Sequence, residues 1–325
     1  MLTNFSYTRP ASLKDAVKQL SSPDSGLHAG GTDLLGCLRD HVFEVKKVVS
    51  ISGLKELRGI TRMPDKGLRI GALTTITEVA ENAAVNEDYA ALAQAAREVG
   101  SPQLRNQGTL GGNLCQKPRC WYYRGEFHCL RKGGDRCFAV SGENQYHCIL
   151  GGGPCYIVHP SDTAAALVAF NASVHIAGPK GSRSVPVEKF HLLPQEDVRR
   201  ETVLKPGEIV TEIVLPAGRG LRSSYRKVRS RASWDFALAG IALAIRFDAG
   251  GAVASARAVL SGAAPIPWRS RELESVITGK KLDADIIAKA AEAALRNAQP
   301  LRENAAKIPL FQGMIEEELA KIGKG

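Results

Sequence analysis

The sequence lacks the patterns of an exported or membrane-anchored chain. Residues 1–30 contain no basic start followed by an apolar core, and no later apolar run approaches the length of a membrane span. We therefore expect no signal peptide, no membrane anchor and no membrane partner for this chain. A cytoplasmic location follows, or a periplasmic one if a partner subunit carries an export signal for the assembly.

Common nucleotide and metal motifs are also missing. No G-x-G-x-x-G fingerprint and no GxxxxGK[ST] loop occurs, which disfavours a Rossmann dinucleotide site and a P-loop nucleotidase. No C-x-x-C pair occurs either, so a zinc ribbon or a ferredoxin-type run of thiols fits poorly.

The composition is that of an ordinary globular protein with a basic excess. A chain of 325 residues with 44% apolar residues can bury a substantial core and suggests two or three folded units. The net charge of +10 fits nucleic acid, an acidic partner or a solvated surface. Because Lys and Arg are spread along the chain, we favour the solvated surface and expect no nucleic acid.

Local patterns predict an α+β fold in two parts. A helix at 12–20, a strand at 45–51, a hairpin across 59–71 and helices from 75 and over 89–99 indicate a mixed unit up to about residue 176. A glycine-rich linker at 178–182 follows. Extended stretches at 208–215, 221–228, 236–247 and 252–261, then helices at 286–297 and 310–322, predict an antiparallel sheet with helices on one face.

Two glycine turns each precede a predicted helix or loop start, at 29–33 and 108–113. Amides freed at such a turn attract anions, and glycine lets the main chain approach a phosphate closely. Thr32, Thr109 and Asn113 could add hydrogen bonds, so the pair could hold a pyrophosphate from both sides. The alternative is two unrelated tight turns.

Six of the seven cysteines lie between Cys115 and Cys155. This density favours metal ligation over buried, unligated thiols, and the spacing leaves both iron–sulfur and zinc open. Neighbouring Arg side chains would favour thiolates, and neighbouring aromatic rings could exclude water. Cys37 stands apart and is expected to be a small core residue.

Five motifs, in order, resemble the FAD-binding medium subunit of the xanthine oxidase family. They are HAGGTDLL at 28–35, QLRNQGTLGGN at 103–113, HPSD at 159–162, PGEIVTEIVLP at 206–216 and YRKVRSR at 225–231. The resemblance implies a two-part α/β FAD-binding domain of the PCMH type at 1–176. It also implies a C-terminal domain of the CO dehydrogenase flavoprotein type at 182–325.

The same resemblance implies which residues contact FAD. By position these are Leu27, His28, Ala29, Gly30, Gly31, Thr32, Asp33, Leu34, Gly108, Thr109, Gly112, Asn113, Asp162, Ile209 and Lys227. Val210 and Arg226 are neighbouring candidates for the two positions nearest the C-terminus. No residue is expected to act as acid, base or nucleophile, so His28, His159 and His191 are expected to be structural.

An insertion at about 115–157 separates the GGN and PSD motifs and holds the cysteines. It resembles the branch of 4-hydroxybenzoyl-CoA reductase and three-subunit aldehyde oxidoreductases, whose flavin subunits carry an extra [4Fe–4S] cluster. That likeness implies Cys120, Cys129, Cys137 and Cys155 as ligands and leaves Cys115 and Cys148 as non-ligands.

The resemblance implies electron transfer within a larger complex. The expected partners are a large molybdenum-cofactor subunit, a small subunit with two [2Fe–2S] clusters, and an external electron carrier. Aldehyde oxidation is the favoured activity, with 4-hydroxybenzoyl-CoA reduction or N-heterocycle hydroxylation as alternatives. Two other classes stay open: a zinc-stabilised nucleic-acid-binding protein and a self-contained flavin oxidase.

Overall fold

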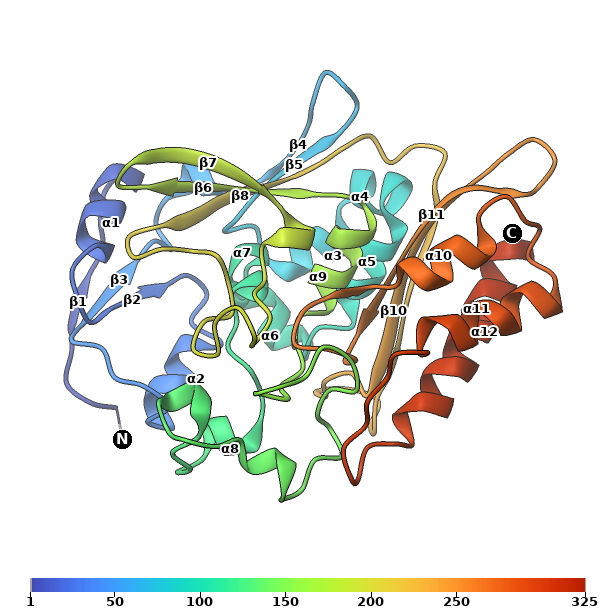
Figure 1. Ribbon diagram of the computed structural model, residues 1–325. Coiled ribbons are helices and arrows are strands. Elements are labelled where there is room, and N and C mark those ends of the chain that lie inside the picture. Colours follow the sequence, from blue (N-terminus) through green and yellow to red (C-terminus); the bar gives the residue numbers. More distant parts are fainter. Residues whose placement is uncertain (1, 325) are drawn as a thin grey trace.

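A computed structural model describes residues 2–324, which form three sheets and the helices around them. The N-terminal sheet is parallel, with the strand order β1-β3-β2, and α1 packs beside it (Figure 1). The bounds are β1 (Ser6–Thr8), β2 (Ser25–His28), β3 (Lys47–Ser50) and α1 (Leu13–Leu20). The Ser12 hydroxyl accepts from the Asp15 amide and starts α1 where the sequence predicts it.

The second sheet is antiparallel and has the order β4-β5-β8-β6-β7. Its strands are β4 (Ile60–Arg62), β5 (Leu68–Gly71), β6 (Ser173–Gly178), β7 (Gly181–Pro186) and β8 (Ile209–Leu215). The stretch 208–215 therefore joins β5 and β6, whereas the sequence interpretation grouped it with the C-terminal strands. The domain boundary near residue 176 stays a prediction.

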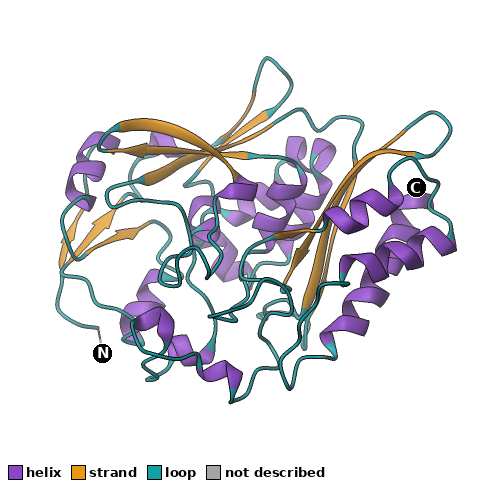
Figure 2. Cartoon of the chain, in the orientation of Figure 1, coloured by secondary structure: helices purple, strands orange, loops and turns teal. Residues whose placement is uncertain are grey.

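Short helices lie between the second sheet and the C-terminal sheet (Figure 2). They are α3 (Ile76–Glu81), α4 (Ala83–Asp88), α5 (Ala90–Arg97), α6 (Pro102–Gln107), α7 (Leu110–Leu114) and α9 (Asp162–Ala169). The predicted capping box forms at α3, where Thr75 and Glu78 each bond the other's backbone amide. Every residue of α9 is buried, because this helix contacts both α5 and the strands β10 and β11.

The C-terminal sheet is antiparallel, with the order β12-β11-β10-β9. Its elements are β9 (Arg222–Val228), β10 (Ala239–Phe247), β11 (Val253–Ser261) and β12 (Trp268–Arg269), with helices α10 (Arg271–Ile277), α11 (Ala284–Ala294) and α12 (Lys307–Lys324). Along β10, Ile241 and Leu243 pack in the core with α10–α12, while Ala242 and Ala244 pack in the core with α5 and α9. This alternation buries both faces of the strand and confirms the predicted α+β fold.

The cysteine-bearing insertion lies at the lower edge of the molecule in Figure 1, between α2 (Leu34–Arg39) and the start of α12. It contains one short helix, α8 (Trp121–Arg124), and two single turns, η2 (Leu130–Lys132) and η3 (Phe138–Val140). Across residues 2–324, none of the helices combines the length and the apolarity that a membrane span requires.

Candidate functional site

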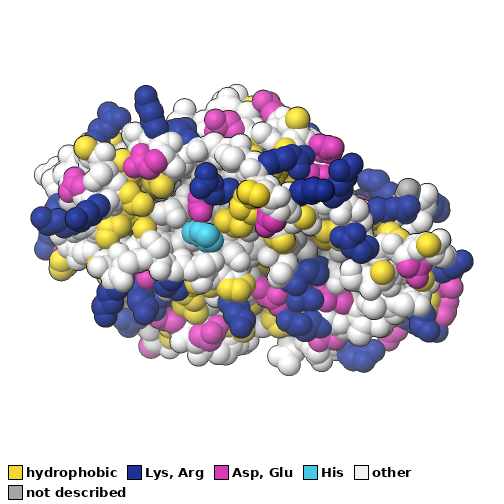
Figure 3. Space-filling view, turned by 90° about the horizontal axis from the view of Figure 1, so that it is seen from above, with side chains coloured by type: hydrophobic (Ala, Val, Ile, Leu, Met, Phe, Trp, Pro, Cys, Tyr) yellow, Lys and Arg dark blue, Asp and Glu magenta, His cyan; other side chains and the backbone are white. Residues whose placement is uncertain are grey.

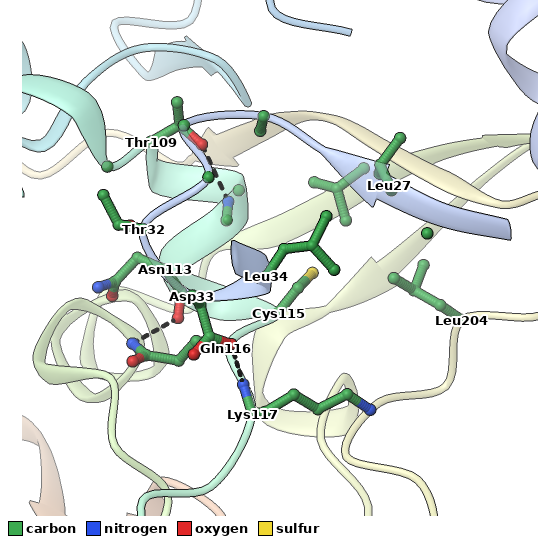
Figure 4. Close-up of a pocket in the computed structure, with 18 of the residues that line it drawn as sticks. Leu27, Thr32, Asp33, Leu34, Thr109, Asn113, Cys115, Gln116, Lys117 and Leu204 are labelled. Atoms are coloured by element: carbon green, nitrogen blue, oxygen red, sulfur yellow. Dashed lines mark hydrogen bonds between the residues drawn. The ribbon is translucent and has the colours of Figure 1, made fainter. Parts of the chain in front are cut away.

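A cavity of about 1310 Å³ opens between the N-terminal sheet, the central helices and the end of β9. Figure 4 shows Thr32 and Asn113 at one end of this cavity, with Leu27 and Leu204 toward the other. A pocket with a polar end and an apolar end suits a ligand that joins a charged group to an apolar ring system.

Most residues that the family resemblance implies as FAD contacts line this cavity. They are Leu27, Ala29, Gly30, Gly31, Thr32, Asp33, Leu34, Gly108, Thr109, Gly112, Asn113, Asp162 and Lys227. His28 and Ile209 are not part of the lining. His28 hydrogen-bonds Ser50 through Nδ1 at 3.0 Å, and Ile209 is fully buried in the N-terminal core, whereas its neighbour Val210 lines the cavity.

The first glycine turn is packed directly against the second. A Cβ atom on Gly30 would collide with the carbonyl oxygen of Gln107, and Gly31 has a φ of +77°, which favours glycine. Two backbone segments can approach this closely only because Gly30 has no side chain. The two turns therefore form one continuous wall of the cavity.

The second turn is held by side-chain hydrogen bonds. Thr109 caps α7 by accepting from the Gly112 amide at 3.2 Å. The Oδ1 atom of Asn113 accepts from the hydroxyls of Ser161 at 2.5 Å and Thr163 at 2.7 Å. Because Oδ1 is fixed by these hydroxyls at the start of α9, the orientation of the Asn113 amide in the cavity wall is fixed as well.

Asp162 and Lys227 connect the two domains at the cavity. Their side chains are 5% and 1% exposed, and Lys227 Nζ lies 2.8 Å from Asp162 Oδ2. The Tyr225 hydroxyl donates to Asp162 Oδ1 at 2.6 Å, and burial raises the pKa of Tyr225. The carboxylate is therefore paired with residues of β9, so Asp162 aligns the C-terminal domain with the cavity.

Several segments of the cavity wall, including 20–26 and 42–45, were missed by the sequence interpretation, and two of them come from the C-terminal half of the chain. The first spans 199–208 and includes Leu204, and the second spans 234–236 and includes Trp234, which is 61% exposed. The second is a loop without a glycine turn or a local motif, and the first overlaps the PGEIVTEIVLP motif only at 206–208, so little in the sequence marked either segment as part of a site.

Asp33 connects the cavity wall that the two glycine turns form to the cysteine insertion. Its Oδ2 atom accepts from the Lys117 amide at 2.7 Å. Its Oδ1 atom lies 2.8 Å from Arg124 Nη2 and 2.9 Å from Arg119 Nη2. Three donors from the insertion thus bind one carboxylate at the start of α2, which fixes the insertion beside the cavity.

Four cysteines of the insertion lie close to one another: Cys120, Cys129, Cys137 and Cys155. Burial raises the pKa of Cys120 to about 11, and the nearby thiols of Cys155 and Cys129 add to that rise. The interaction between the neighbouring Cys137 and Cys155 thiols lowers the pKa of Cys137 and raises that of Cys155. The fold therefore groups the four thiols that the family resemblance implies as ligands.

The remaining cysteines have other surroundings. Burial raises the pKa of Cys115 and of Cys148 to about 12. Cys37 is fully buried on α2, as predicted, and accepts from Arg124 Nη1 at 2.8 Å. Within residues 2–324, no group of three or more His, Cys, Asp or Glu side chains has the geometry to hold a metal ion.

The C-terminal domain contacts the insertion from the other side. Asn144 and Glu303 exchange two hydrogen bonds between backbone amides and side chains, of 3.1 and 2.9 Å. Asn304 donates to the carbonyls of residues 147 and 148, and the buried Lys307 donates to that of His147 at 3.1 Å. Burial lowers the pKa of Lys307 to about 8. The insertion is therefore fixed at both ends.

Comparison with known proteins agrees with this geometry. Residues 3–218 match the family of the FAD binding domain in molybdopterin dehydrogenase, and residues 223–309 match the CO dehydrogenase flavoprotein C-terminal domain. The chain belongs to the FAD-binding medium subunits of the xanthine oxidase and CO dehydrogenase family, and is thus an FAD-binding subunit of a molybdenum hydroxylase-type oxidoreductase.

Particular relatives cover almost the whole chain. The aldehyde oxidoreductase FAD-binding subunit PaoB of Escherichia coli is 33% identical, over 98% of this chain and 98% of that protein. The glyceraldehyde dehydrogenase medium chain of Sulfolobus acidocaldarius is 30% identical, over 87% of this chain and 84% of that one. A carbon monoxide dehydrogenase structure from Hydrogenophaga pseudoflava aligns with a TM-score of 0.76 and 26% identity, covering 98% of this chain and 96% of that one.

We predict that Gly30→Ala lowers the flavin content of the purified protein at least tenfold. The added Cβ would displace the Gln107 carbonyl and separate the two turns. Gly36→Ala is the matched control, because a Cβ on Gly36 in α2 meets nothing within 4 Å. Flavin per chain is measured from the absorbance after denaturation. A Gly30→Ala protein with full flavin would contradict the assigned role of the turn.

We also predict that stability falls in mild acid because of two buried histidines. His159 and His191 have ring centroids 4.1 Å apart, and burial lowers the pKa of His191 to about 4. Between this value and the ordinary 6.5, the unfolded chain binds more protons, so stability falls as the pH falls through that window. Protonation of His191 alone should lower the free energy of unfolding by about 2 kcal/mol at pH 5 relative to pH 7.

The measurement compares melting temperatures at pH 7 and pH 5 for the wild type, His191→Gln and His128→Gln. Gln can keep the hydrogen bond that His191 Nε2 makes with the Leu114 carbonyl, without a titrating ring. His191→Gln should therefore lose less stability in acid than the wild type, and the variant at the exposed His128 should behave like the wild type. An equal fall in melting temperature from pH 7 to pH 5 in all three proteins would refute the role assigned to His191.

Proposed function

We propose that this chain carries one FAD and one [4Fe–4S] cluster and transfers electrons within a molybdenum-dependent aldehyde oxidoreductase. The observation that carries the proposal is the grouping of Cys120, Cys129, Cys137 and Cys155 in an insertion that Asp33 binds to the wall of the flavin cavity. One chain would then hold two redox groups side by side.

The chain's own residues suit a dinucleotide with a diphosphate. The turns at 29–33 and 108–113 line the cavity and offer main-chain amides to a phosphate, and Thr32 and Asn113 add polar side chains. Leu27 and Leu204 supply the apolar part of the wall. Bound FAD exchanges either one or two electrons, which lets it couple unlike redox partners.

The cysteine insertion suits an iron–sulfur cluster better than a single metal ion. Each ligand of a [4Fe–4S] cluster binds a different iron, so the four sulfur atoms need not converge on one point. Trp121, Tyr122, Phe127 and Phe138 pack edge to face or stacked around the loop and would exclude water. His147 Nε2 lies 3.3 Å from Cys120 Sγ and would orient that thiolate.

The proposed complex has a large molybdenum-cofactor subunit and a small subunit with two [2Fe–2S] clusters. An external carrier would exchange electrons with the [4Fe–4S] cluster at the lower edge of the molecule in Figure 1. Similarity to the aldehyde oxidoreductase FAD-binding subunit PaoB over nearly the whole chain favours an aldehyde substrate over an aryl-CoA thioester or an N-heterocycle. We place the complex in the cytoplasm, or in the periplasm if a partner subunit directs export.

Nucleic-acid binding is the weaker candidate. The residues Arg226, Lys227, Arg229 and Arg231 line a groove, but Lys227 is buried against Asp162 and Arg229 is paired with Glu98. Figure 3 shows Lys and Arg scattered over the face it displays, among acidic and apolar side chains. The basic excess therefore resembles a solvated surface rather than a continuous phosphate-binding patch.

Replacing Cys129 by Ser should remove the iron and the visible absorption of the cluster while the flavin stays bound. A hydroxyl is a much poorer ligand for iron than a thiolate. Cys148→Ala is the matched control in the same insertion and should keep both groups. Iron and flavin are quantified on anaerobically purified protein. Unchanged iron in Cys129→Ser, or equal iron loss in Cys148→Ala, would refute the ligand set.

The substrate and partner assignments are tested on the purified complex and on this chain alone. An aldehyde should bleach the flavin absorbance of the complex within its turnover time, and it should leave the flavin of the isolated chain oxidised. Reduction of the isolated chain by substrate would instead identify a self-contained flavin oxidase. Bleaching by an N-heterocycle or an aryl-CoA thioester, and not by aldehydes, would overturn the aldehyde assignment.

A further inference from the structure

Arg131 has buried hydrogen-bond donors without acceptors. Its side chain is only 1% exposed, and its Nη1 atom lies 2.8 Å from Glu201 Oε1. The Nε and Nη2 atoms are buried and have no partner within residues 2–324. Because an unsatisfied charged donor in the interior is costly, these two atoms indicate an acceptor that the polypeptide itself does not supply.

The charge balance around Arg131 points to an anion. The Glu201 carboxylate is shared between Arg131 and Lys117, so two cations face one acidic group. The side chains of Arg131 and Glu201 are almost completely buried, where water screens charge poorly. A second negative group beside Arg131 would balance this excess of positive charge.

The position of Arg131 identifies that anion. Arg131 follows Cys129 by two residues, and its charge partly offsets the rise in the pKa of Cys155 that the Cys137 hydrogen bond and burial cause. Arg131 also lines the flavin cavity. The guanidinium therefore lies near the grouped cysteines and in the wall of the cavity, and Glu201 holds it there.

We propose that Arg131 donates hydrogen bonds from Nε and Nη2 to sulfur atoms of the [4Fe–4S] cluster, and that its charge raises the reduction potential of that cluster. This inference rests on the cluster proposed above. A bound cluster that accepted one electron from reduced flavin would become more negative by one charge, and no bond would form or break at Arg131. A fixed guanidinium stabilises that added charge, since hydrogen bonds to sulfur and nearby charge both set cluster potentials.

The test is a redox titration of the complex, monitored by EPR, together with iron and flavin quantitation. Arg131→Gln removes the charge and the fork of donors, whereas Arg131→Lys keeps the charge alone. Arg136→Gln is the matched control, because Arg136 lies in the same loop, is exposed, and stacks on Phe138 at 4.8 Å. Arg131→Gln should lower the equilibrium constant for reduction of the cluster at least tenfold. This corresponds to a reduction potential lower by about 59 mV. Arg131→Lys should shift the potential less, and so should Arg136→Gln, because water and salt screen the exposed Arg136 charge.

Three outcomes would overturn the inference. The first is a wild-type potential in iron-replete Arg131→Gln, and the second is an equal shift in Arg136→Gln. The third is a loss of flavin with an unchanged cluster potential, which would mean that Arg131 binds the flavin diphosphate instead of the cluster.

If Arg131→Gln retains no iron, the Arg131→Lys variant tests the proposal. A lowered cluster potential in Arg131→Lys supports the directed hydrogen bonds, and a wild-type potential contradicts them. A wild-type protein that contains no iron would instead contradict the proposal that this chain binds a cluster.

Discussion

The carboxylate of Asp33 is the interaction on which the arrangement of the site depends. It lies at the start of α2, in the wall of the flavin cavity, and accepts from the Lys117 amide, Arg119 and Arg124. These bonds hold one side of an insertion that contains only one short helix and two single turns. A loop with so little regular structure needs such external contacts to position side chains accurately.

The C-terminal domain supplies the matching contacts on the other side. Asn144 pairs with Glu303, and Lys307 donates to the carbonyl of His147 within the insertion. The same domain reaches the cavity through Lys227, which pairs with Asp162 at the start of α9. The flavin cavity and the insertion that holds the cysteines are thus each fixed by polar contacts to the C-terminal domain.

Features encoded locally could be predicted from the sequence. The helix starts at Ser12 and Thr75, the extended stretch that forms β10 and the two glycine turns are set by neighbouring residues, and the structure confirms them. Long-range features could not. The pairing of β8 with β5 and β6 depends on contacts between distant segments. Ile209 and Val210 are neighbours on β8 and point to opposite faces of the sheet. Ile209 therefore packs in the N-terminal core, whereas Val210 lines the cavity.

The central claim is that this chain holds a flavin and an iron–sulfur cluster next to each other. The most direct measurement is the EPR spectrum of the chain, purified anaerobically, as it is reduced stepwise. The account predicts a flavin radical and a reduced [4Fe–4S] signal in the same chain, with magnetic interaction between them when both are present. A chain that shows the flavin radical alone, with no iron signal at full reduction, would contradict it.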